Sequence, residues 1–270
     1  MRGVSSSLDR SDRAATASRD RYWEVDLART LAIGMMFVYH TGYDVDFLAP
    51  SVGIDPLDGG WRALQVACGS LFLFVAGLSF TISDASSRRR GLDWAARLRK
   101  HALRGGQVFG FGLAISLVTW IALDDRYVRF GILHAIGASI ALAPFVARLG
   151  VWNAPLGVGV IVVGLLLKDE RSDIPGLLIL GLRPSDGAGV DYYPLLPWFG
   201  LVLLGIAAGS ILYPDGRRGR WGKRLTVSPG RWLTAPGRHS LVIYLVHQPV
   251  LIITLAGILA VLGVDRAWPE

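Results

Sequence analysis

Long apolar stretches separated by short polar segments run through almost the whole chain. Each stretch approaches the roughly 18–25 residues that an α-helix needs to cross a hydrocarbon core about 30 Å thick. The pattern predicts seven membrane-spanning helices, at 26–44, 61–83, 101–123, 130–148, 153–168, 193–213 and 238–263. The fifth of these is the shortest. The fold class predicted from this pattern is therefore all-α, a polytopic membrane helix bundle.

The first 22 residues differ from the rest of the chain, because they are rich in Ser, Arg and Asp and have no apolar face. Such a composition is typical of disorder. We therefore expect a disordered cytoplasmic tail at 1–22 and a single transmembrane domain at 23–270. The first apolar stretch is not followed by a small-residue cleavage site, so we expect it to be retained as a helix.

Composition and charge agree with this class. The chain is 52% hydrophobic and only 18% charged, and its formal net charge is +7. If the N-terminus is cytoplasmic, 21 of the 28 Lys and Arg residues fall on the inner side of the membrane. That asymmetry predicts a multi-pass protein of the cell (plasma) membrane with its N-terminus inside and its C-terminus outside. It also accounts for the basic charge without a nucleic-acid partner, and the lipid bilayer is the expected surrounding.

A polar stripe occupies one face of the first predicted span. Arg29 and His40 are eleven residues apart, which is close to three helical turns and about 16 Å along the axis. Asp44 follows one turn later. Ionisable groups within a span are expected to face the protein interior and to mark a working site. A carboxylate one turn from an imidazole can hold its tautomer, so we expect His40 to be a general base oriented by Asp44.

Two further histidines are predicted to lie inside the bilayer. His134 is near the outer end of the fourth span, and His247 is in the seventh span beside Pro249, which is expected to kink the helix. Both are at depths from which they could reach His40, but a packing role alone remains an alternative for each. The remaining two histidines are predicted to be interfacial residues at inner helix ends: His101 and His239.

Five segments of the chain, in order, carry a family resemblance: RYWEVDLARTLAIGMMFVYH, GSLFLFVAGLSF, RFGILHAIG, DYYPLLPWFGLVLLGIAAG and GRHSLVIYLVHQP. They resemble the family named for the catalytic domain of heparan-α-glucosaminide N-acetyltransferase, and most closely its compact bacterial and archaeal members of unknown substrate. The resemblance extends over residues 21–255. The spacing Arg29-x10-His40 is also similar to the Arg-x10-His motif of the wider transmembrane acyltransferase superfamily.

The resemblance implies transfer of an acyl group, typically acetyl from acetyl-CoA, to a hydroxyl or amine of a sugar or glycan. A first-span histidine is implicated in catalysis in that superfamily, and His40 is the matching position. It would act as a base on the acceptor or, alternatively, carry the acyl group itself. The lysosomal enzyme's histidine in the first outer segment has no counterpart, because residues 41–60 contain no histidine.

The candidate residues fall into three groups. Those expected to take part in catalysis are His40, Asp44 and His247. The basic cluster at 88–104 and Arg29 are expected to attract the phosphates of acetyl-CoA at the cytoplasmic side, and the residues singled out for this role are Arg29, Arg88, Arg89 and Arg90. Those expected to bind the acceptor are His134, Asp191, Tyr192 and Trp198. No metal is expected, and self-association into a homo-oligomer is left open.

Two other functions are compatible with histidines inside a membrane bundle. A transporter or flippase would use them as a proton relay. A haem-binding electron-transfer protein would need paired axial histidines at matching depths, and it would show a Soret band when purified.

Overall fold

The structure is a computed structural model that describes residues 22–174, 176–187, 189–224 and 229–263. The predicted tail therefore lies, except for Tyr22, outside the described residues. The longer helices are α2 (Trp23–Leu48), α3 (Gly59–Arg89), α4 (Trp94–Leu123), α5 (Ile132–Val146), α6 (Asn153–Leu166), α8 (Leu195–Leu212) and α10 (Ser240–Val261). The short ones are α7 (Leu177–Leu180) and α9 (Arg231–Arg238), together with 3-10 turns at Pro50–Val52, Asp124–Arg126, Ala147–Trp152, Pro214–Gly216 and Arg220–Arg224. The all-α bundle is confirmed.

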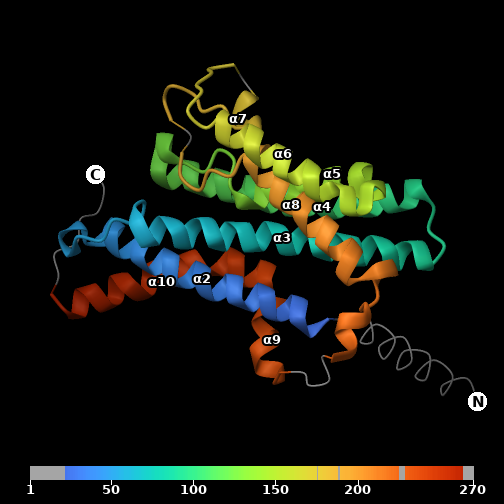
Figure 1. Cartoon of the computed structure of the whole chain (residues 1–270). Coiled ribbons are helices and arrows are strands. Elements are labelled where there is room, and N and C mark those ends of the chain that lie inside the picture. The colour runs from blue at the N-terminus through green and yellow to red at the C-terminus, as the bar shows by residue number, and fades with distance from the viewer. Residues whose placement is uncertain (1–21, 175, 188, 225–228, 264–270) are drawn as a thin grey trace, which may run out of the picture.

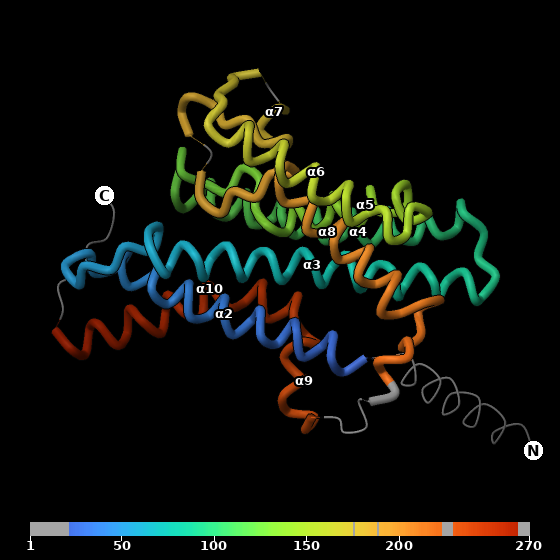
Figure 2. The backbone as a smooth tube through the Cα atoms, viewed as in Figure 1, coloured from blue at the N-terminus to red at the C-terminus, as the bar shows by residue number. Residues whose placement is uncertain are grey.

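Helix α3 is the axis of the bundle. It packs against α2 on one side and against α8 on the other, while α4 pairs with α5 and α6 pairs with α8 (Figures 1 and 2). Helix α10 lies along α2, so the last long helix returns to the first. Because α2 begins at one end of the bundle and α10 finishes at the other, the described chain begins and ends at opposite ends.

Among the described residues, five helical segments are long and apolar enough to cross a membrane: Gly59–Arg89, Trp94–Arg126, Ile132–Leu166, Leu195–Leu212 and Ser240–Val261. The third of these joins α5 to α6 across Gly150, whose φ of 53° and ψ of −119° are not helical. At 1.5 Å per residue, α5 and α6 are each only about 20 Å long. Helix α2 is long enough to cross a membrane, but its acidic and basic residues lower its mean hydropathy. A helical membrane protein is thus supported, while the count of seven crossings stays a prediction.

The connection between α3 and α4 is shorter than the sequence pattern predicted. Helix α3 continues to Arg89, and α4 already begins at Trp94. The side chain of Asp93 accepts the Ala96 N–H at 2.8 Å, which satisfies one of the free donors at the start of α4. The basic residues between 88 and 104, predicted to form an inner loop, are therefore mostly arranged on two helix ends, where helix geometry fixes their direction.

Glycines allow α3 and α8 to approach each other at the backbone. A Cβ added at Gly77 would lie 2.1 Å from the Val202 carbonyl oxygen, and one added at Gly205 would lie 2.0 Å from the Phe74 carbonyl oxygen. Small residues at helix crossings are the usual means of close packing in membrane proteins. This reciprocal contact fixes the depth at which the α3 side chains stand relative to the rest of the bundle.

Helix α9 joins the beginning of α10 to the beginning of α2. The Gly237 N–H donates to the Thr30 hydroxyl at 3.0 Å, and a Cβ at Gly237 would lie 1.9 Å from the Asp26 carbonyl oxygen. This contact holds α9 and the start of α10 against α2.

Candidate active site

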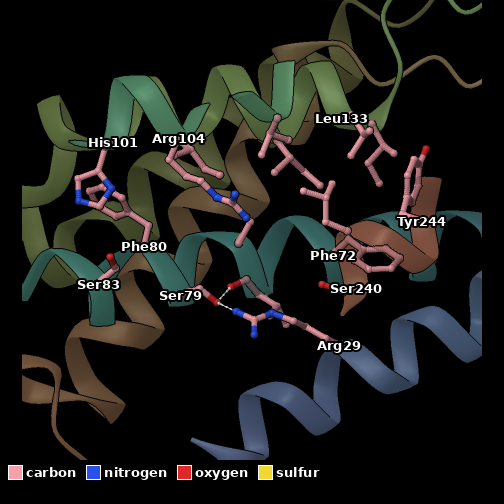
Figure 3. Close-up of a pocket in the computed structure, with 17 residues that line it drawn as sticks. Arg29, Phe72, Ser79, Phe80, Ser83, His101, Arg104, Leu133, Ser240 and Tyr244 are labelled. Carbon is pink, nitrogen blue, oxygen red and sulfur yellow. Dashed lines mark hydrogen bonds between the residues drawn. The ribbon is translucent and has the colours of Figure 1, made fainter. Parts of the chain in front are cut away.

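A cavity of about 260 Å³ lies between α2, α3, α4, α5 and α10. Its polar lining residues are Arg29, Ser79, Ser83, His101, Arg104 and Ser240. Figure 3 shows Arg29 and Arg104 approaching from opposite walls, with Phe72 and Tyr244 at the end away from His101. The polar residues come from the first turns of α2, α4 and α10 and from the last part of α3. They therefore gather at the end of the bundle that the charge pattern predicts to be cytoplasmic.

The Arg29 guanidinium is held at the edge of this cavity by two hydrogen bonds. Its Nη1 donates to Asp26 Oδ1 at 2.9 Å, and its Nη2 donates to Ser79 Oγ at 2.6 Å. Asp26 is only 1% exposed and also lies 3.6 Å from Arg238 Nε. A buried carboxylate requires such partners. Arg29 thus has a fixed position, which was not evident from its place at the start of a span.

His101 is buried within the protein, at 3% exposure, and its place at the depth of the membrane interface stays a prediction. Its Nε2 lies 3.5 Å from Asp84 Oδ1, and Arg97 Nε lies 3.5 Å from the same oxygen. Its ring also packs on Phe80 at 4.6 Å between centroids. Arg104 follows His101 by three residues, so both project from one face of α4. The predicted basic cluster at 88–104 included Arg104, but the sequence alone does not separate it from the other basic residues there.

A second, smaller cavity of about 30 Å³ adjoins the first. The residues that line both cavities are Phe72, Ile132 and Tyr244. We call the smaller cavity the inner chamber. Its other lining residues are Met36, Tyr39, His40, Gln65, Cys68, Gly69, Asp191 and Tyr193. His40 therefore faces a space that is separated from the larger cavity by three side chains.

His40, which lines the inner chamber, lies side by side with His247, with ring centroids 4.8 Å apart and an interplanar angle of 65°. His247 Nδ1 hydrogen-bonds the Tyr244 carbonyl oxygen, which fixes that ring. His40 Nδ1 and His247 Nε2 are buried and have no hydrogen-bond partner within the described residues. The structure thus brings together two of the three predicted catalytic residues, while their roles stay predictions.

Asp44, the third predicted catalytic residue, is placed differently from the expectation. It is 1% exposed, and its Oδ1 accepts a hydrogen bond from Gln248 Nε2 on α10. No hydrogen bond joins it to the His40 ring in the part of the chain that the structure describes. Because Gln248 follows His247, Asp44 anchors α10 beside the histidine pair instead of orienting His40 directly. Pro249 lies inside α10, which continues as a helix to Val261.

Asp191 lines the inner chamber from the loop before α8. Its backbone has a φ of 52°, and its Oδ2 accepts the Ile132 N–H at 3.2 Å at the start of α5. Burial raises the pKa of Asp191 to about 6, against the lowering effect of the Ile132 N–H and the Tyr244 hydroxyl. A carboxyl group of this kind can accept a hydrogen bond from a polar ligand and can exchange a proton near neutral pH.

The other predicted acceptor-binding residues do not line either cavity. The Tyr192 hydroxyl donates to the Leu178 carbonyl at 2.6 Å, and Trp198 packs on Tyr193 with ring centroids 4.6 Å apart. His134 Nδ1 accepts the Gly131 N–H at 3.1 Å and caps the start of α5. Its ring stacks on Phe130. The geometry gives all three a packing role, and acceptor binding by them stays a prediction.

Three members of the predicted phosphate-binding cluster, at the end of α3, do not line the larger cavity: Arg88, Arg89 and Arg90. Arg104, at the other end of that cluster, does line it. Arg88 Nε instead lies 3.7 Å from Asp84 Oδ2. Within the described residues, no group of three or more His, Cys, Asp and Glu side chains is placed to hold a metal ion.

Apolar helices around a cavity and an adjoining smaller chamber define a helical integral membrane protein with an internal site. The family model described as Heparan-alpha-glucosaminide N-acetyltransferase, catalytic, matches residues 21–249, and the chain belongs to this family. The match confirms the resemblance noted from the sequence and includes every residue that lines the two cavities. Family membership indicates a membrane acetyltransferase. No curated protein matches the chain.

Proposed function

We propose that the protein transfers an acetyl group from acetyl-CoA to a hydroxyl or amine of a sugar or glycan, with His40 as the general base. The observation that supports this most directly is the shared wall of the two cavities. A larger cavity with two guanidinium groups adjoins a small chamber that contains a histidine with an unpartnered ring nitrogen.

The chemistry of the larger cavity supports acetyl-CoA as the donor. Arg29 and Arg104 approach it from opposite walls, and guanidinium groups bind phosphates through paired, charge-assisted hydrogen bonds. Beyond them the lining becomes largely apolar toward Phe72, which suits an extended chain that ends in a thioester. Along α2, Arg29 and His40 are about 16 Å apart, so the phosphates and the reacting carbonyl would be separated by most of the cavity.

The reaction follows from the position of His40. Its neutral imidazole removes the proton from the acceptor hydroxyl or amine as the acceptor oxygen or nitrogen attacks the thioester carbonyl carbon. The bond between that carbon and the CoA sulfur then breaks. The thiolate takes the proton back from the imidazolium, so the products are free CoA and the acetylated acceptor. His247 packs against the His40 imidazole, the ring that gains and loses the proton. Asp44 holds α10 in place through its hydrogen bond with Gln248.

The donor would enter at the end of the bundle where α2 begins, which the charge pattern predicts to be cytoplasmic. The acceptor would then reach the inner chamber from the opposite side, past Asp191. This arrangement suits an enzyme of the cell membrane that modifies a sugar or glycan with a cytoplasmic acetyl donor.

The proposal is tested with purified protein in detergent or vesicles, radiolabelled acetyl-CoA and a panel of sugars and glycans. Transfer of label to an acceptor, with release of free CoA, is the expected result. Movement of a labelled glycan across vesicles without consumption of acetyl-CoA would instead identify a transporter.

Replacement of Arg104 by Ala is expected to weaken acetyl-CoA binding by about 10- to 100-fold, because one charge-assisted hydrogen bond contributes about 1.5–3 kcal/mol. Isothermal titration with acetyl-CoA measures the change. Arg148→Ala is the matched control, since Arg148 is exposed and lines neither cavity. Equal affinity of both variants and the unsubstituted protein would show that the donor binds elsewhere.

A further inference from the structure

The inner chamber is small enough to discriminate between acyl groups. A single water molecule needs about 10–15 Å³ of cavity volume. A chamber of about 30 Å³ therefore accommodates roughly two or three heavy atoms. An acetyl group has three heavy atoms. A butyryl group has five and would have to displace part of the chamber wall.

The wall between the chamber and the larger cavity consists of Phe72, Ile132 and Tyr244. Two of these also hold other groups in place. The Ile132 N–H bonds Asp191, and the Tyr244 carbonyl bonds His247. Phe72 provides only its apolar ring, which packs against the cluster that contains Met36 and Cys68. In Figure 3, Phe72 stands at the end of the larger cavity, beside Tyr244.

The other side of the chamber cannot readily enlarge. Gly69 lies one turn before Phe72 on the same face of α3. A Cβ at Gly69 would be 2.5 Å from the Tyr193 ring, so Tyr193 already fills the space behind it. Tyr193 itself is buried. An acyl chain longer than acetyl therefore gains no space behind Gly69, and it would have to extend toward Phe72.

We propose that the Phe72 ring sets the acyl chain length of the donor, by closing the inner chamber so that acetyl fits beside His40 and longer acyl groups do not. This inference rests on the proposed acetyltransferase function. Truncation of Phe72 merges the chamber with the larger cavity, so the additional methylene groups of a longer donor find space next to the reacting carbonyl.

The experiment compares kcat/KM for acetyl-CoA, propionyl-CoA and butyryl-CoA in the unsubstituted protein and in Phe72→Ala. One methylene in an apolar pocket typically changes specificity by about tenfold or more. We expect the unsubstituted protein to favour acetyl-CoA over butyryl-CoA by at least about tenfold, and Phe72→Ala to raise the butyryl-to-acetyl ratio by a similar factor.

Two further variants keep the test decisive. Phe72→Leu removes less volume and should give an intermediate ratio, so it replaces Phe72→Ala if that variant does not fold. Phe74→Ala is the matched control, because Phe74 is on the same helix but lines neither cavity. Its ratio should equal that of the unsubstituted protein.

The outcomes separate this inference from the function on which it rests. If the unsubstituted protein transfers acetyl, and the ratio is the same in folded Phe72 variants as in Phe74→Ala, the role of Phe72 is wrong and the enzyme function stands. If the unsubstituted protein transfers no acyl group from any of the three donors, the proposed function itself is wrong.

Discussion

Replacement of His40 by Ala is expected to lower the rate of acetyl transfer by about 10²- to 10⁴-fold, the usual contribution of a general base. His40 lines the inner chamber and has a buried ring nitrogen without a hydrogen-bond partner in the described residues. Acetyl-CoA affinity should change little, because the guanidinium groups that would bind its phosphates line the larger cavity, whereas His40 lines the inner chamber. The measurement is kcat with labelled acetyl-CoA, together with the donor affinity.

His239→Ala is the control for this substitution, since it removes an exposed histidine that lines neither cavity. Unchanged kcat in folded His40→Ala would remove His40 from the mechanism. Mass spectrometry of the protein after incubation with acetyl-CoA alone distinguishes the two roles that the sequence left open. A stable acetyl adduct that is present in the unsubstituted protein and lost in His40→Ala would show that His40 carries the acyl group.

Replacement of Gly205 by Ala is expected to destabilise the bundle by about 1–3 kcal/mol or more, as overpacking of a close contact usually does. The new Cβ would lie 2.0 Å from the Phe74 carbonyl oxygen, and a backbone atom of α3 cannot move aside without shifting the whole helix. The measurement is the Tm of the purified protein in detergent, with the yield of monodisperse protein as a second readout.

Gly110→Ala is the matched control, because the same substitution within a helix meets nothing within 4 Å at that position. Alanine is otherwise favoured over glycine inside a helix by about 0.5–1 kcal/mol, so this variant should keep or slightly raise the Tm. Equal Tm values for the two variants would contradict the close packing of α3 on α8.

Much of the fold could be predicted from single stretches of sequence. Apolar runs of sufficient length indicate membrane helices whatever surrounds them, because the backbone in lipid has to satisfy its own hydrogen bonds. The helix ends were less predictable. The Asp93 cap starts α4 well before the apolar run begins, since a helix can continue beyond the membrane when its polar residues face water.

Part of the candidate site could also be predicted. The eleven-residue spacing of Arg29 and His40 follows from helix geometry alone, and both residues line the cavities. The other residues that line the cavities with them could not be predicted in the same way. Arg104 resembled the other basic residues near it, and its place in the larger cavity depends on the packing of α4 against α5.

The sequence by itself determined the class of protein, the family and the polar face of the first helix, because composition, ordered motifs and helical periodicity are local properties. The tertiary structure decided which faces meet. It placed His247 beside His40, paired Asp44 with Gln248, and made Phe72 part of the wall between two cavities. These contacts join residues up to about two hundred positions apart, and they depend on glycines that admit one helix backbone against another.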